Sequence, residues 1–161
     1  MKTKPRRLGV DIGKVIIQRD TEEWQPNKPR QEIPNARKVI ARLVSEEFGK
    51  ENVFLISKAD ALKQIESRAW LLENNFYEDT GINPLHVIFC MHRADKAKIC
   101  KTLSITHFID DRLEVLSHLV DIVSHLYLFN PRIEETSKFP QFLPYVCEAR
   151  TWKNIEELFF D

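Results

Sequence analysis

Short apolar runs alternate with longer stretches of helical periodicity along this 161-residue chain, and this alternation limits the fold more than any other feature. Strands covered by helices on both sides are apolar on both faces, so parallel sheets produce such near-continuous runs. We therefore expect an α/β fold, a Rossmann-like three-layer sandwich with a mostly parallel sheet. Five strands are expected at residues 6–17, 52–57, 86–90, 107–109 and 125–129, and residues 145–147 are a candidate sixth strand at the edge.

Helix start and stop signals separate these runs. Asn35 precedes a helical pattern that Gly49 ends, and Asp60 precedes the next pattern. Further helices are expected to begin near residues 95, 112 and 151. Most strands are thus followed by a helix, which a parallel sheet requires because its strands need crossover connections.

The length of the chain favours one domain. With 161 residues, 43% of them hydrophobic, the chain can bury one core but is too short for two ordinary domains. We expect a single domain over residues 1–161 without a cap domain. Residues 18–34 show no periodicity and are long enough to form a lid over a binding site.

Charge and cysteine usage narrow the partners and the compartment. Lysine plus arginine and aspartate plus glutamate both number 24, so the formal net charge of +0 argues against general nucleic-acid binding. No apolar run approaches the roughly 20 residues that cross a bilayer, and the basic start lacks the apolar core of a signal peptide. The three cysteines are widely spaced, as free thiols are. We expect a soluble protein of the reducing cytoplasm with no membrane partner.

Chemically distinct polar residues stand where the apolar runs end. Asp11 follows the start of the first run, Ser57 ends the second, and Asp110 and Asp111 follow the fourth, while Lys96 lies just beyond the third. Because parallel strands end at the same edge of a sheet, and ligands of such folds collect there, we expect these side chains to converge.

The converging groups are suited to phosphoryl transfer. Three carboxylates within a few ångströms repel one another and call for a cation, and Mg²⁺ prefers oxygen ligands and substrate phosphates. Asp11 is the candidate nucleophile, while Ser57 and Lys96 are placed to stabilise the phosphoryl oxygens. We therefore predict a magnesium-dependent phosphomonoester hydrolase with an aspartyl-phosphate intermediate. Its expected substrate is a nucleotide, another phosphorylated small molecule or the phosphorylated end of a macromolecule.

The order of these motifs resembles the haloacid dehalogenase-like superfamily of phosphohydrolases. The segments that carry the resemblance are Val10-Asp11-Ile12-Gly13, Ile56-Ser57, Lys96 and Ile109-Asp110-Asp111. The segments Arg93-Ala94-Asp95-Lys96 and Arg150-Thr151-Trp152 are most similar to the 5′(3′)-deoxyribonucleotidase branch. The resemblance implies that Asp11 is both nucleophile and metal ligand, and that the Gly13 carbonyl and Asp110 are further ligands of the magnesium ion. It implies that Asp111 is either a ligand or a residue that contacts the ligands. It also implies that phosphate is held by Ser57 and Lys96, and the adjacent Lys58 is a further candidate phosphate-binding residue.

Two departures from the family pattern leave alternatives open. The superfamily carries a second Asp two residues after the nucleophile, as general acid and base, and Gly13 stands at that position here. Losing such a group typically costs about 10²–10⁴ in rate. A catalytically impaired protein that binds phosphate and metal is therefore one alternative. Without a cap domain the site would be open, so a nucleic-acid end-processing phosphatase is another.

Plainer roles compete for several of these residues. Asp110 and Asp111 are placed to cap the helix that follows them. Lys96 competes with Lys98 for the phosphate-binding role, and either could be a solvated helix charge. Arg93 is better placed for a surface ion pair than for a substrate contact.

Overall fold

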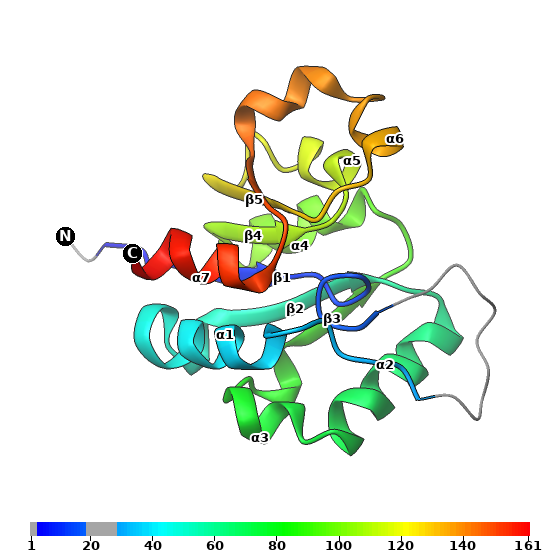
Figure 1. Cartoon of the computed structure of the whole chain (residues 1–161), viewed down its shortest axis with the longest axis vertical. Helices are drawn as coiled ribbons and strands as arrows, with labels where there is room; N and C mark the ends of the chain where they lie inside the picture. The colour runs from blue at the N-terminus through cyan, green and yellow to red at the C-terminus, as the bar shows by residue number, and fades with distance from the viewer. Residues whose placement is uncertain (1–2, 19–28) are drawn as a thin grey trace.

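The computed structural model describes residues 3–18 and 29–161, which form one six-stranded sheet with helices on both faces (Figure 1). All neighbouring strands are parallel and follow the order β3-β2-β1-β4-β5-β6, which confirms the predicted Rossmann-like α/β class. The strands are β1 (Leu8–Val10), β2 (Val53–Lys58), β3 (Val87–Cys90), β4 (His107–Asp110), β5 (His125–Phe129) and β6 (Cys147–Ala149).

The helices cover the sheet in two layers. Four of them pack on the face that contains Leu8, Val10 and Leu55: α1 (Ala36–Arg42), α2 (Ala61–Glu73), α3 (Phe76–Thr80) and α7 (Trp152–Phe160). The opposite face is covered by α4 (Asp95–Thr102) and α5 (Leu113–Ser117). Five shorter segments complete the described chain: a π-helical continuation of α1 (Leu43–Phe48), the one-turn α6 (Ile133–Thr136), and 3₁₀ segments at Lys50–Asn52, Pro84–His86 and Pro140–Tyr145.

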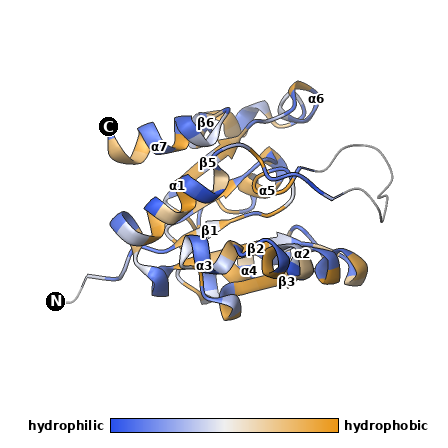
Figure 2. Cartoon of the chain, turned by 60° about the horizontal axis from the view of Figure 1, so that its bottom comes forward, coloured by the Kyte–Doolittle hydropathy of each residue, from blue (hydrophilic) through white to orange (hydrophobic). Residues whose placement is uncertain are grey.

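Alternation along the strands divides the core in two. Leu55 contributes to the core under α1 and α7, whereas Phe54 and Ile56 contribute to the core under α4 and α5. Figure 2 shows hydrophobic residues along the central strands and mixed colours along the outer helices. Gly9 is required on the second face, because a Cβ there would lie 2.6 Å from the Phe108 ring.

The local sequence signals predict where helices begin more accurately than where strands end. Asn35 directly precedes α1, and the Asp60 carboxylate accepts a hydrogen bond from the Lys63 amide at 2.9 Å. The first strand was expected to continue to Ile17, but β1 ends at Val10. Its apolar continuation instead curls into a loop in which the amides of residues 16 and 17 donate to the Ile12 carbonyl. These residues are buried in a turn, which periodicity alone cannot distinguish from a strand.

Other boundaries also differ from expectation. The helix expected to begin near residue 112 is only five residues long and ends at Ser117, and the edge strand expected over 145–147 begins at Cys147. The five-residue α3 was not predicted. Among the described residues, no helix has both the length and the apolar character needed to cross a membrane.

The predicted lid over residues 18–34 falls largely on residues 19–28, which lie outside the described residues. The two ends of this segment are described. Ile17 and Glu32 form an antiparallel bridge, and the Gln18 amide donates to the Gln31 carbonyl at 2.8 Å. The two described ends of this segment therefore lie side by side, and its role as a lid stays a prediction.

Candidate active site

A cavity of about 450 Å³ lies at the carboxyl ends of the strands, where the strand order reverses between β1 and β4. Ligands of open α/β sheets bind at this switch point because loops leave the sheet there in opposite directions. Every residue predicted for the site lines the cavity: Asp11, Gly13, Ser57, Lys58, Lys96, Asp110 and Asp111. The convergence expected from strand ends is therefore confirmed.

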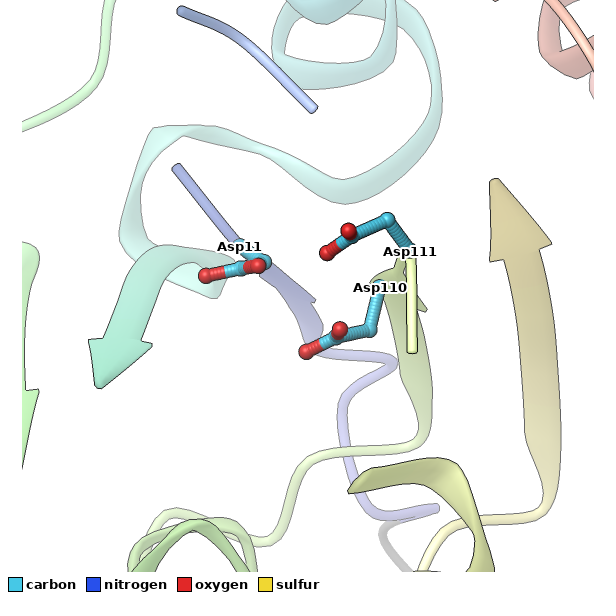
Figure 3. Close-up of side chains that lie close together, drawn as sticks. All are labelled: Asp11, Asp110 and Asp111. Carbon is cyan, nitrogen blue, oxygen red and sulfur yellow. The ribbon is translucent and has the colours of Figure 1, made fainter. Parts of the chain in front are cut away.

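Three carboxyl groups meet in this cavity. Asp11 follows β1, and its amide donates to the Ile109 carbonyl at 3.0 Å, which fixes its position beside β4. Asp110 ends β4, and Asp111 is the next residue. Each offers one oxygen, and the three oxygens lie within 4.8 Å of one another (Figure 3). Asp110 is fully buried and Asp11 nearly so, while Asp111 is half-buried.

Lys96 brings a positive charge into the carboxyl cluster. It lies in the first turn of α4 with only 2% of its surface exposed. Its Nζ lies 2.7 Å from Asp110 Oδ2 and 3.2 Å from Asp11 Oδ1. Burial acts to lower the pKa of this ammonium, but the carboxylates of Asp11 and Asp110 outweigh burial and raise it. Lys96 is therefore charged, whereas its rival Lys98 is exposed.

Negative charge exceeds positive charge in the cluster. Burial raises the pKa of Asp110, and the nearby Asp11 carboxylate raises it further. The pKa of Asp111 is raised by burial and then by Asp110 and Asp11. Within the described part of the chain, Lys96 is the one buried ammonium that faces these three acids. A divalent cation would bring the sum to zero, so the charge balance and the oxygen donors fit Mg²⁺.

Ser57 supplies a hydroxyl to the same cavity. It is 3% exposed, and its Oγ has no hydrogen-bond partner among residues 3–18 and 29–161. A buried hydroxyl without a partner is costly, so a ligand oxygen is the fitting acceptor. Helix capping does not explain Ser57, because Asp60 caps α2. Lys58 is exposed and also lines the cavity.

Asp110 and Arg93 also make the structural contacts that were considered for them, a contact at the start of a helix and a surface ion pair. Asp110 Oδ1 accepts a hydrogen bond from the Arg112 amide at 3.0 Å, so Asp110 also fixes the turn before α5. Arg93 forms an ion pair with Glu114 at 3.2 Å. Asp110 therefore combines a turn contact with its place in the carboxyl cluster.

Two features of the site were missed in the sequence. The Glu135 carboxylate accepts hydrogen bonds from the amides of Leu113 and Glu114, at 3.0 and 2.9 Å, and so caps α5 from a distant segment. No local signal could identify this cap, because the partners lie more than 20 residues apart. Two basic residues that line the cavity, Lys63 and Arg132, were also missed.

Comparisons with known proteins identify the fold. No model of a known protein family matches the chain, and no curated protein matches its sequence. The structure is similar to D,D-heptose 1,7-bisphosphate phosphatase from B. bronchiseptica, crystallised with magnesium and phosphate, with a TM-score of 0.71 and 12% identity over 96% of this chain and 97% of that one. The structure is also similar to the same phosphatase from Burkholderia thailandensis, with a TM-score of 0.64 and 14% identity over 97% of this chain and 99% of that one.

A third solved structure extends the likeness beyond the heptose phosphatases. A haloacid dehalogenase-like family hydrolase from Xanthomonas campestris gives a TM-score of 0.62 and 10% identity over 96% of this chain and 94% of that one. At such low identities the likeness concerns the arrangement of the backbone. The chain therefore has the fold of haloacid dehalogenase-like hydrolases.

Proposed function

We propose that this protein is a phosphomonoester hydrolase in which Asp11 accepts the phosphoryl group. The observation that carries the proposal is the position of Asp11 at the switch point of the sheet, between a buried ammonium and two further carboxyl groups. The fold shared with phosphatases and the motif order of the superfamily support it. We assign Asp11, Ser57 and Lys96 to the reaction and Lys58 to phosphate binding.

The proposed reaction has two displacement steps. A carboxylate oxygen of Asp11 bonds to phosphorus while the ester P–O bond breaks, which gives an acyl phosphate and an alkoxide. Water then attacks the acyl phosphate, releases inorganic phosphate and regenerates Asp11. The Ser57 hydroxyl donates to a non-bridging oxygen of the phosphoryl group, and Lys96 holds the Asp11 carboxylate in place.

Asp11, Asp110, Asp111 and the Gly13 carbonyl are the residues that would hold Mg²⁺. When bound, the ion neutralises negative charge on the phosphoryl oxygens. Lys96 remains paired with Asp110 and so limits the number of carboxylate oxygens available to the ion. Such a small ligand set suits Mg²⁺, which keeps several waters of its own.

Gly13 makes the departure of the leaving group the difficult step. It has no side chain to protonate the alkoxide, so the proposed reaction takes this proton from water. Esters of acidic alcohols, such as p-nitrophenol, should therefore be hydrolysed much faster than alkyl esters. The same absence favours the second candidate function, a phosphate- and metal-binding protein without turnover. The nucleotidase branch and the cytoplasmic setting stay predictions of the sequence, and a nucleic-acid end stays a candidate substrate.

The test is hydrolysis of p-nitrophenyl phosphate with Mg²⁺. We expect turnover by the wild type, loss of turnover with a chelator, and a loss of about 10³-fold or more in Asp11→Asn, because nucleophile loss has effects of that order or larger. Asp60→Asn is the matched control, since Asp60 lines the same cavity but caps α2 outside the carboxyl cluster. Equal rates in wild type and Asp11→Asn would rule out the enzyme. Phosphate binding without turnover would favour the second candidate.

Replacing Gly13 sharpens this test. Gly13→Asp supplies a carboxyl group where the superfamily has its acid and base. We expect it to accelerate alkyl phosphates by about 10-fold or more and p-nitrophenyl phosphate far less, because only the poor leaving group needs the proton. The measurement is the slope of log kcat against the pKa of the leaving alcohol. The same slope in both proteins would show that proton donation does not limit the wild type.

A further inference from the structure

We propose that the leaving group of the substrate carries a second anionic group, a phosphate or carboxylate, that binds in a cavity beside the active site. The inference rests on the proposed function for the identity of the first phosphate. The second cavity has a volume of about 580 Å³ and shares Lys14, Asp111 and Arg132 with the first. A molecule whose phosphate lies at Asp11 can therefore extend past Asp111 into the second cavity.

The second cavity is lined by cations from separate parts of the chain. Arg132 follows β5, Arg150 follows β6, and Lys153 lies in the first turn of α7. All three side chains are exposed, and none forms an ion pair with any acid in residues 3–18 or 29–161. Asp111 is the one acid among the described lining residues. Among the described residues, these three cations therefore give the cavity an excess of positive charge.

This concentration of cations contrasts with the composition of the chain. The whole sequence has 24 basic and 24 acidic residues. Ten basic and five acidic residues are among the described lining residues of the two cavities. Three of those acids belong to the carboxyl cluster, which Lys96 and Mg²⁺ would balance. The remaining excess is larger than one phosphate dianion requires, which favours a ligand with two anionic groups.

The rest of the second cavity suits an organic body between two anions. Ile33 and Pro34 provide apolar surface in the lining of this cavity. Three of the five described non-glycine residues with positive φ also line this cavity: Lys14, Asn35 and Asn130. Asparagine tolerates this conformation, but Lys14 does not adopt it readily. Such backbone concentrates at ligand sites, and Lys14 lies where the two cavities meet.

The lining favours a small molecule over a nucleic-acid end. Proteins that hold single strands stack bases on accessible aromatic rings. Within the described part of the chain, Phe129 is the one aromatic residue that lines either cavity, and it is 1% exposed. Because the described lining offers no stacking surface, its cations are suited to recognise a compact second anion. We therefore commit to a small phosphate ester with a distal phosphate or carboxylate.

Calorimetry with non-hydrolysable phosphonates tests the proposal in the presence of Mg²⁺. Propylphosphonate carries one anionic head, and propane diphosphonate carries one at each end; ethane, butane and pentane diphosphonates vary the spacing. We expect the best diphosphonate to bind wild type about tenfold more tightly than its monophosphonate. Arg150→Gln/Lys153→Gln should reduce this ratio to about one, since both residues line only the second cavity.

Two further proteins and ligands make the result specific. Lys98→Gln/Lys101→Gln removes two exposed positive charges from α4, away from both cavities, and should keep the tenfold ratio. Carboxylate-terminated alkylphosphonates separate a carboxylate site from a phosphate site. A ratio near one in wild type, or a ratio that survives in Arg150→Gln/Lys153→Gln, would overturn the proposal. The proposal would also be overturned if a phosphorylated oligonucleotide bound more tightly than every diphosphonate and this binding depended on Arg150 and Lys153.

The outcome separates this inference from the proposed function, because binding requires no turnover. A wild type that hydrolyses p-nitrophenyl phosphate but prefers no diphosphonate would overturn the second anion site alone. A wild type that shows the tenfold ratio but hydrolyses no ester would overturn the hydrolase and keep the site.

Discussion

The two ends of β4 bury titratable side chains in opposite ways. At the amino end, His107 stacks on His125 with ring centroids 4.3 Å apart and meets Phe48 edge-on at 5.1 Å. Burial, followed by the charges of His125 and Arg6, lowers the pKa of His107 to about 4. At the carboxyl end, Asp110 is buried as one partner of an ion pair with Lys96.

The two ends of β4 differ in how much their buried titratable groups stabilise the fold. A neutral imidazole in an aromatic cluster satisfies burial without a partner of opposite charge. The carboxyl end instead gathers three acids around one ammonium, an arrangement that often stabilises less than apolar packing of the same volume would. Groups held in this way are typical of ligand sites. The amino end therefore contributes to stability, and the carboxyl end has the features expected of the proposed ligand site.

Opposite pH dependences follow from the two ends. Between pH 6.5 and about 4 the unfolded chain protonates His107 while the folded chain does not, so the free energy of unfolding falls as the pH falls. The pKa of Asp110 is raised above its ordinary 3.8, so the folded chain holds that proton more tightly. Without metal, the free energy of unfolding contributed by Asp110 therefore falls as the pH rises. The two contributions oppose each other.

Removing Lys96 should have the largest effect on stability. In Lys96→Met, the carboxylates of Asp11 and Asp110 lose their buried partner. We expect the free energy of unfolding at pH 7.5 to fall by about 3–5 kcal/mol, because breaking a buried pair leaves uncompensated charge. Urea unfolding with a chelator measures it. Excess Mg²⁺ should restore part of the loss.

The matched control is Lys98→Met, which removes an exposed ammonium two residues further along α4. We expect a change within about 0.5 kcal/mol. If Lys96→Met were equally mild, the buried pair would contribute little, and the contrast between the two ends of β4 would be lost.

The amino end predicts the next largest effect. His107→Phe keeps an aromatic ring beside Phe48 and His125 but cannot take up a proton. As the pH falls from 6.5 to about 4, the free energy of unfolding of the wild type should decrease by roughly 2 kcal/mol because of His107. The variant should not show this decrease. Urea unfolding across this range measures the slope, and pH 7.5 gives the internal reference for lost packing. Equal slopes in both proteins would contradict a neutral His107.

This contrast also explains what could be predicted from the sequence. The carboxyl end was predictable because Asp11, Ser57 and Asp110 interrupt or end apolar runs, where a buried polar side chain needs a reason. The parallel sheet followed from the same runs. His107 was expected only as the start of a strand, since its stacking partners come from distant elements.

Features built from distant or weakly patterned residues escaped prediction. The cap that Glu135 provides for α5 and the cationic lining of the second cavity both depend on tertiary contacts. Exposed Arg132 and Lys153 look like ordinary solvated charges in the sequence. The end of β1 was misplaced because a buried loop and a buried strand have the same composition.

The smallest expected effect tests whether the carboxyl end is destabilising without metal. Asp111→Asn removes an acid whose pKa is raised by burial and by Asp110 and Asp11. In the presence of a chelator at pH 8, we expect the free energy of unfolding of the variant to be about 1 kcal/mol higher than that of the wild type. The reason is that less negative charge is confined in the carboxyl cluster. With excess Mg²⁺ the order should reverse, since bound cation stabilises the wild type more.

Asp121→Asn, at an exposed position, should change neither value. Thermal unfolding with and without Mg²⁺ measures the crossing, and parallel shifts in the two proteins would mean that Asp111 takes no part in holding the cation.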